Sequence, residues 1–216
     1  MRDNQPKHRQ LSRERVKLAR KKASRAGMPA ILIVCEGRET EPNYIEGLCG
    51  EHRINLANVT IIRGNDSTDV LSLVKRAKML FERDRDFDRV FVVFDDDGQA
   101  LAKAQELAAK RLKTLSGKSI CIELITSKPS FELWLLLHFE YTTRPFANAA
   151  EVTAALGAYL TNYDKADRRL FLQVASGMDR AVANAERLQR KAAQGGDLYP
   201  RSNLHALVRS LLEISG

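Results

Sequence analysis

Two strongly apolar segments that each end in acidic residues restrict the fold of this chain more than any other feature. The segment 31–35 (ILIVC) is followed directly by Glu36. The segment 90–94 (VFVVF) is followed by three aspartates, of which Asp95 is the first and Asp97 the last. Continuous runs of this kind are typical of strands buried on both faces of a parallel sheet. Because the carboxyl ends of parallel strands meet at one edge, neighbouring strands would bring Glu36, Asp95 and Asp97 together.

Acids placed together in this way predict a metal site. Three crowded carboxylates repel one another, so the arrangement is stable only with a cation or with shared protons. Hard oxygen ligands of this kind suit Mg²⁺ or Mn²⁺. Such an ion can polarise a phosphoryl oxygen, activate water and stabilise a leaving oxygen. We therefore predict that Glu36, Asp95 and Asp97 hold Mg²⁺ or Mn²⁺.

The hydrophobic pattern predicts alternating strands and helices. Strands are expected at 30–35, 58–63, 89–94 and 119–125, and helices after Thr40, at 69–83 (capped by Ser67 or Thr68), at 99–115 and after Ser130. This order predicts an α/β fold with a mainly parallel four-stranded sheet flanked by helices. Helices expected at 148–158, 177–193 and 201–214 form a helical C-terminal part. The predicted divisions are a basic arm (1–28), a core (29–140) and a helical extension packed on it (141–216).

Positive charge is concentrated in the arm. Residues 1–28 hold ten Lys/Arg and two acids, whereas the rest of the chain holds 25 of each, so the whole net charge of +8 lies in the arm. A basic block attracts nucleic acid through counterion release, and a solvated arm without a partner is the alternative. The arm residues expected to contact nucleic acid are Arg13, Arg15, Lys17, Arg20, Lys21, Lys22 and Arg25.

Three further charged residues each have two interpretations. Glu41 is either an acid in the first turn of a helix capped by Thr40, where acids are favoured, or a second metal-binding carboxylate. Glu132 begins a helix that is apolar on nearly all sides, and a carboxylate there needs a partner. It satisfies backbone donors or joins the acidic site. Lys165 is a solvated loop residue or stabilises a charged phosphate. Trp134 and His138, on the apolar helix, are expected in the core.

Several classes of protein do not fit the sequence. No apolar run approaches the roughly 18 residues that span a membrane, and the basic N-terminus lacks the apolar region of a secretory signal. There is no Walker A or GxGxxG motif and no His/Cys cluster of zinc type. Cys35, Cys49 and Cys121 form no CxxC pair and are expected to be reduced core residues. We therefore expect a cytoplasmic protein without a membrane partner.

Two other folds that place acids around Mg²⁺ fit less well. A receiver-like domain needs a lone acceptor aspartate and a later lysine, and Lys128 could supply the lysine, but the Glu36-Gly37 pair fits that domain poorly. A phosphatase with an Asp-x-Asp-x-Thr motif would need threonine where Gln99 stands.

Glutamate after the first hydrophobic strand, followed by Asp-x-Asp after a later one, resembles the Toprim fold of topoisomerases, bacterial primases and overcoming-lysogenization-defect nucleases. More narrowly, the chain resembles the RloB-like family. The matching stretches are ILIVCEGRETEPNY (31–44), VFVVFDDDG (90–98), PSFELWLLLHFE (129–140), YDK (163–165) and YPRSNLHALV (199–208). The chain departs from the family pattern at Lys128, where asparagine is expected, and at Arg38, a position that is often acidic.

The resemblance implies a Toprim-like, metal-dependent nuclease that cuts RNA, including tRNA, or DNA in prokaryotic anti-phage defence. Relatives lie in restriction-modification and abortive-infection loci, often beside an ABC-type ATPase, which is therefore an expected partner; a homo-oligomer stays open. Residues expected to act in catalysis are Glu36, Asp95, Asp97, Glu41, Glu132 and Lys165. Among these, Glu41 and Glu132 would hold a second cation or activate water. The alternative is a non-catalytic subunit that binds nucleic acid or the ATPase.

Overall fold

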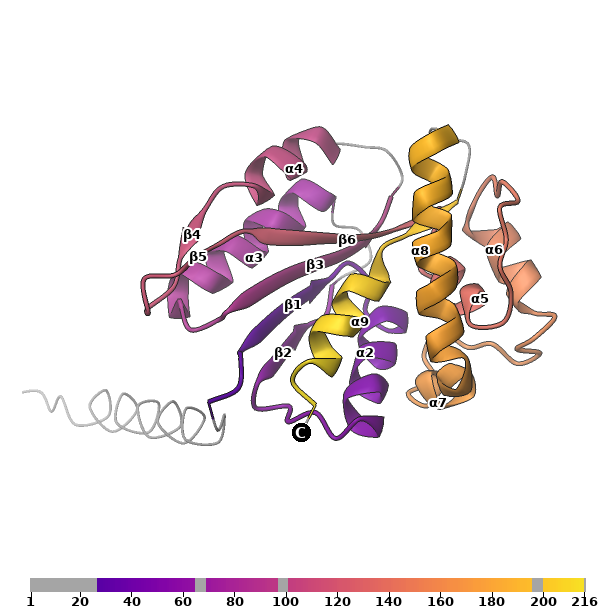
Figure 1. Cartoon of the computed structure of the whole chain (residues 1–216), viewed down its shortest axis with the longest axis horizontal. Helices are drawn as coiled ribbons and strands as arrows, with labels where there is room; N and C mark the ends of the chain where they lie inside the picture. Colours follow the sequence, from indigo (N-terminus) through magenta and orange to yellow (C-terminus); the bar gives the residue numbers. More distant parts are fainter. Residues whose placement is uncertain (1–26, 65–68, 97–100, 196–199, 216) are drawn as a thin grey trace, which may run out of the picture.

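A central sheet covered by helices on both faces forms the body of the protein (Figure 1). The computed structural model describes residues 27–64, 69–96, 101–195 and 200–215. The sheet has the strand order β2-β1-β3-β6-β7. Its strands are β1 (Ile31–Cys35), β2 (Val59–Ile62), β3 (Arg89–Asp95), β6 (Ile122–Lys128) and β7 (Arg201–Ser202). The first four are mutually parallel, which confirms the predicted parallel sheet of four strands.

The fifth strand corrects the prediction that a helix begins at residue 201. β7 runs antiparallel to β6, pairing Ser127 with Ser202, and α9 (Leu204–Leu212) begins only after it. Asn203 explains the delay, because its side chain accepts from the Thr126 N–H at 2.6 Å and donates to the Leu124 carbonyl at 2.9 Å. The edge of β6 thus takes hydrogen bonds that would otherwise be unsatisfied.

The register of the strands aligns their carboxyl ends. Cys35 of β1 pairs with Val93 of β3, and Asp95 of β3 pairs with Ser127 of β6. The Glu36 N–H continues this ladder and donates to the Val93 carbonyl at 2.9 Å. Glu36 and Asp95 therefore leave the sheet side by side.

Both faces of the sheet are buried, as the continuous apolar runs predicted. Alternate residues of β1 enter different clusters: Ile31, Ile33 and Cys35 belong to one, and Leu32 and Val34 to the other. The second cluster lies under α3 (Val70–Asp84) and α4 (Leu101–Ala108). The first lies under α2 (Thr40–Glu51), α5 (Glu132–Leu137), α7 (Leu170–Val174), α8 (Met178–Gly195) and α9. Figure 1 shows these two groups on opposite sides of the strands.

The helical C-terminal part is not separate from the sheet. α6 (Ala149–Leu156) packs on α5, and α8 packs on α5 and β7. Helices were predicted near α6 and α8, whereas α7 and the short 3₁₀ helix η1 (Ala175–Gly177) were not. No helix in the described part of the chain has the length and apolar character needed to cross a membrane.

The segment between β3 and β6 differs from the prediction. The helix expected at 99–115 ends at Ala108, and β4 (Leu112–Lys113) and β5 (Ser119–Ile120) form a small antiparallel hairpin. Gly117 has a φ of +83° in its turn, a conformation that favours glycine. The prediction of Cys121 as a core residue is wrong, because it lies exposed between β5 and β6. Cys35 and Cys49 are buried, as expected.

Two predicted helix caps are wrong. Thr40 is already the first residue of α2, and Glu39 before it makes no capping hydrogen bond with its side chain. The side chain of Asp69 caps α3 by accepting from the Ser72 N–H at 3.1 Å; Ser67 and Thr68, the predicted caps, lie outside the described residues.

Trp134 and His138 are core residues, as predicted. Both are buried, and the Nδ1 atom of His138 lies 2.9 Å from the Trp134 carbonyl oxygen. Because a carbonyl oxygen only accepts, Nδ1 carries the proton and Nε2 accepts from the Tyr44 hydroxyl at 3.1 Å. Burial lowers the pKa of His138 to about 4, so the ring is neutral.

Candidate active site

A pocket of about 370 Å³ lies at the carboxyl ends of β1 and β3. Five of the six residues predicted to act in catalysis line it: Glu36, Glu41, Asp95, Glu132 and Lys165. The sixth, Asp97, lies outside the described residues, as do the arm residues between Arg13 and Arg25. The structure therefore brings together side chains that lie up to 129 positions apart in the chain.

Backbone N–H groups hold the two carboxylates at the strand ends. The Asp95 N–H donates to Glu36 Oε2 at 2.9 Å. The Phe131 N–H, just before α5, donates to Asp95 Oδ1 at 2.8 Å. This chain of bonds links β1, β3 and the start of α5, so the orientation of each carboxylate depends on the sheet register rather than on a flexible loop.

Glu41 turns back from α2 toward the loop after β1. Its Oε1 atom accepts from the Gly37 N–H at 3.2 Å, and the residue is 7% exposed. A Cβ atom at position 37 would overlap the Glu41 carboxylate, so this close approach requires glycine. Burial raises the pKa of Glu41, and the nearby Glu132 and Glu36 charges raise it further, against the opposing effect of backbone hydrogen bonds. Glu41 lies in the first turn of α2 and also lines the pocket, so both interpretations describe its position.

Glu132 is held by side chains of three other residues. Ser130 Oγ donates to Glu132 Oε2 at 2.6 Å, and the Tyr163 hydroxyl donates to Oε1 at 3.0 Å. The Lys165 ammonium lies 2.9 Å from the same Oε1 atom. Burial alone would raise the pKa of Glu132, but the Ser130 hydrogen bond and Lys165 outweigh it and lower the pKa. Glu132 is therefore a buried, ionised carboxylate, and Ser130 binds it rather than capping α5.

Lys165 projects into the pocket from a loop that α2 holds in place. The Asn43 side chain donates to the Lys165 carbonyl oxygen at 3.5 Å and accepts from Arg63 at 3.1 Å. Partial burial would lower the pKa of Lys165, but Glu132, Asp95 and Glu41 together raise it, so the side chain stays a cation. Its position beside the carboxylates corresponds to the second interpretation of this residue, not to a loop lysine far from the site.

The acids of the pocket carry excess negative charge. Burial raises the pKa of Asp95 to about 8, and Glu41, Glu132 and Glu36 add to the shift. A divalent cation would relieve this repulsion, and carboxylate oxygens are the donors that Mg²⁺ and Mn²⁺ prefer. Glu36 and Asp95 therefore fit part of a site for such an ion. In the part of the chain that the structure describes, no three acidic, His or Cys side chains converge into a complete metal-binding group.

Comparison with known protein families identifies the chain. The model of a family described as RloB-like protein matches residues 31–211. The chain belongs to the RloB-like family. No curated protein and no solved structure matches it significantly. In this RloB-like chain the matched region includes every described residue of the pocket and excludes the basic arm.

Asp96 of the RloB-like chain has a different environment from its neighbour Asp95. Arg201 of β7 lies 2.6 Å from Asp96 Oδ2, and the Asp96 N–H donates to the Ser127 carbonyl at 2.9 Å. Asp96 is buried and does not line the pocket. Successive side chains of a strand point to opposite faces, so the separation of Asp95 from Asp96 follows from β3 itself.

Sequence reasoning missed Ser130, Tyr163 and Arg63 as residues of the RloB-like site. Ser130 and Tyr163 lie in the PSFE and YDK stretches, close to Glu132 and Lys165, and that proximity was the available signal. Arg63 follows β2 and donates to the Arg38 carbonyl at 2.7 Å, in the loop that carries Gly37. No local pattern indicates this contact, which depends on β2 pairing with β1.

Proposed function

We propose that this RloB-like protein is a Toprim-like, metal-dependent nuclease that hydrolyses phosphodiester bonds in RNA, including tRNA, or in DNA, as an effector of prokaryotic anti-phage defence. The observation that carries the proposal is the convergence of four carboxylates and one lysine in a pocket at the carboxyl ends of parallel strands. Function in open α/β sheets collects at this edge. Neither small-molecule nucleotide motifs nor a nucleophilic Ser or Cys accompanies these residues in the pocket.

Glu36 and Asp95, with Asp97, would hold Mg²⁺ or Mn²⁺. When bound there, the ion supplies Lewis acidity toward a phosphoryl oxygen and lowers the pKa of coordinated water. The backbone bonds from Asp95 to Glu36 and from Phe131 to Asp95 keep these carboxylates in position for that role.

Lys165 and Glu132 would act as a pair on the phosphate. Glu132 is committed to Ser130, Tyr163 and Lys165, so we assign it the positioning of the lysine rather than metal binding. The Lys165 ammonium then stabilises the negative charge that develops on the phosphate. Glu41 is the carboxyl group that would exchange a proton with water in the pocket, because its pKa is raised.

A cleavage assay tests the proposal. Purified protein is incubated with a total tRNA pool, single-stranded RNA, or plasmid or linear DNA, in Mg²⁺, Mn²⁺ or EDTA. Asp95→Ala/Asp97→Ala is compared with Glu106→Ala, which removes an exposed acid on α4. We expect cleavage that requires metal, is lost in the double variant and persists in Glu106→Ala. Full activity of the double variant would refute the assignment.

The incomplete metal-binding group favours one alternative, a non-catalytic subunit that binds nucleic acid or an ABC-type ATPase. Manganese binding, measured by electron paramagnetic resonance, separates the two functions without depending on an activating partner. A nuclease of the proposed kind binds Mn²⁺ and loses that binding in Asp95→Ala/Asp97→Ala. Absence of Mn²⁺ binding together with absence of cleavage would support the non-catalytic subunit.

A further inference from the structure

The exposed end of α8 carries a cationic pocket that the acidic site does not include. Its volume is about 440 Å³, and its lining residues are Tyr141, Thr143, Arg187, Arg190 and Lys191. We propose that this pocket binds the phosphate backbone of a single-stranded nucleic acid and so extends the binding surface of the active site. The proposal rests on the proposed function for the identity of the ligand.

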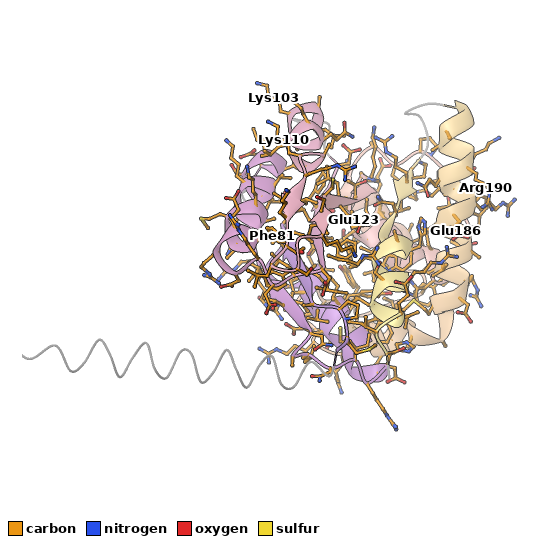
Figure 2. The ribbon with its side chains drawn as sticks, turned by 60° about the vertical axis from the view of Figure 1, so that its left-hand side comes forward. Phe81, Lys103, Lys110, Glu123, Glu186 and Arg190 are labelled. Carbon is orange, nitrogen blue, oxygen red and sulfur yellow. The ribbon has the colours of Figure 1, made fainter. Side chains whose placement is uncertain are left out.

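The spacing of the α8 residues brings their charges onto one side of the helix. Arg187, Arg190 and Lys191 are related as i, i+3 and i+4, so their side chains are neighbours. All three are exposed, and Figure 2 shows Arg190 projecting outward from α8. No acidic residue is among the residues that line this pocket. Because residues 29–216 are neutral in total, composition does not reveal this local charge.

Contacts with the segment after α5 hold α8 in place beneath the pocket. Arg180 donates to the carbonyl oxygens of His138 and Phe139, both at 3.2 Å, and Asn184 donates to the Leu137 carbonyl at 2.9 Å. One helical turn further along α8, the Arg187 guanidinium carbon lies 3.9 Å from the centre of the Tyr141 ring. The pocket therefore lies on a rigid support.

Stacking prepares Arg187 for an anion. A guanidinium held flat against an aromatic ring keeps its N–H groups at the edge of the stack, where they match two oxygens of a phosphate. Little side-chain entropy is then lost on binding, because the ring already restricts the rotamers. The Thr143 hydroxyl offers a further donor in the same pocket. Planar donors, additional cations and a hydroxyl are the groups that contact nucleic-acid phosphates.

Stabilisation of the helix does not explain these cations. Positive side chains favour the C-terminus of a helix only within its last turn. α8 continues to Gly195, and no basic residue lies in its last turn. Arg187, Arg190 and Lys191 therefore lie outside the region in which the helix dipole would favour them.

The pocket lies within reach of a strand bound at the acidic site. Tyr141 is nine positions after Glu132, and α5 fills most of the interval. A short helix followed by four extended residues spans at most about 22 Å. A single strand of several nucleotides covers such a distance, so one strand can lie in both pockets. The cations would then position the backbone while the acidic site acts on one phosphate.

Binding of labelled single-stranded RNA and DNA, followed by fluorescence anisotropy over a range of salt concentrations, tests the inference. Every protein carries Asp95→Asn, so cleavage does not interfere. Arg187→Gln/Arg190→Gln/Lys191→Gln is compared with Lys103→Gln/Lys110→Gln/Lys113→Gln, which removes the same charge from exposed positions on and just after α4. Figure 2 shows Lys103 and Lys110 away from α8. The arm is present in both, so its contribution cancels.

We expect the α8 triple variant to bind at least tenfold more weakly than the control variant at moderate salt. The slope of log K against log[salt] should fall by roughly two to three, since each lost phosphate contact contributes about 0.9. Arg187→Lys keeps the charge but loses the planar stack, and we expect an intermediate affinity. Arg190→Gln alone replaces one exposed side chain and serves as the second variant if the triple variant does not fold.

Equal affinities and salt slopes for the two triple variants would overturn the inference, as would failure of the full chain to bind either nucleic acid. Binding of an acidic protein by the α8 residues in place of nucleic acid would also overturn it. The outcome is separable from that of the nuclease proposal. A protein that binds through the α8 pocket but never cleaves retains this inference alone. A protein that cleaves equally well with both triple substitutions in the presence of Asp95 retains the nuclease proposal alone.

Discussion

Lys165 Nζ lies 2.9 Å from Glu132 Oε1, and the two side chains differ sharply in exposure: 61% for the lysine and 2% for the glutamate. A buried carboxylate thus fixes the position of an exposed cation at the rim of the acidic pocket. This contact makes Lys165→Met the most direct test of a role in transition-state stabilisation. We expect the rate of cleavage at saturating substrate to fall about 10²–10³-fold, as for removal of one oxyanion donor.

Two further variants control that experiment. Lys165→Arg keeps a cation near Glu132 and should retain part of the rate. Glu132→Gln leaves oxygen and nitrogen atoms for Ser130 and Tyr163 but removes the charge that holds Lys165, so an intermediate loss is expected. A Lys165→Met variant with an unchanged rate would show that the lysine is a solvated loop residue.

Asp95→Asn separates metal binding from folding. The amide oxygen can still accept from the Phe131 N–H, but one of the mutually repelling charges is gone. In EDTA we expect the variant to have a melting temperature equal to or higher than that of the unmodified protein. Addition of Mg²⁺ should raise the melting temperature of the unmodified protein and leave that of the variant unchanged. A Mg²⁺-dependent rise in both proteins would place the ion elsewhere.

Gly64→Ala tests the contact between the end of β2 and the loop that carries Glu36. A Cβ atom at position 64 would overlap the Glu36 carbonyl, and the Gly64 N–H donates to the Gly37 carbonyl at 3.1 Å. We expect a loss of about 2 kcal/mol in the free energy of unfolding, measured in urea, together with reduced cleavage.

Gly50→Ala is the matched control for this substitution. No heavy atom lies within 4 Å of a Cβ built at position 50, which is inside α2. Alanine should therefore stabilise the protein by about 0.5–1 kcal/mol through its helix propensity. Equal stabilities for the two variants would refute the steric explanation.

Arg201→Met tests how much the ion pair with Asp96 stabilises the edge strand β7. Asp96 is buried, so losing the guanidinium leaves a carboxylate with less compensation in a low-dielectric environment. The expected loss is about 1–3 kcal/mol, below the value for a fully enclosed pair because Arg201 is partly exposed. Asp96→Asn/Arg201→Met should recover part of the loss. A double variant that is less stable than Arg201→Met alone would show that Asp96 is needed for another reason.

His138 should make the stability of the fold depend on pH. Its pKa is about 4 in the folded chain and about 6.5 in an unfolded one, so only the unfolded chain takes up a proton between these values. Its contribution to stability is fully present above about pH 6.5 and is lost as the pH falls toward 4. The slope is at most about 1.4 kcal/mol per pH unit. Urea unfolding at several pH values should show a smaller slope for His138→Gln; an identical slope would exclude this histidine as the cause.

The centre of the sheet could be predicted because its signal is local. The runs 31–35 and 90–94 have the length and composition of strands buried on both faces, and they are the adjacent strands β1 and β3. Glu36 and Asp95 follow from this, because residues just after neighbouring parallel strands lie at one edge. The same reasoning could have separated Asp95 from Asp96 by the alternation of side chains.

The errors have a different origin. β7 exists because Ser202 and Asn203 bond to the edge of β6, about 75 positions away, and two residues carry no strand signal of their own. The expected helix at 99–115 gives way to a hairpin whose strands have two residues each. Thr40 lies inside α2 because the loop after β1 is organised by Glu41 and Arg63 instead of by a capping hydroxyl.

The sequence by itself determined the class of the fold, the two central strands, the burial of α5 and the acids that leave β1 and β3. These follow from hydrophobic periodicity and strand direction, which are properties of short segments. Only the tertiary structure decided that Ser130, Tyr163 and Lys165 surround Glu132, that Asp96 pairs with Arg201, and that α8 stacks Arg187 on Tyr141. The physical reason is that a buried charge or an oriented cation requires a partner at a specific distance, and chain topology brings that partner from a distant segment.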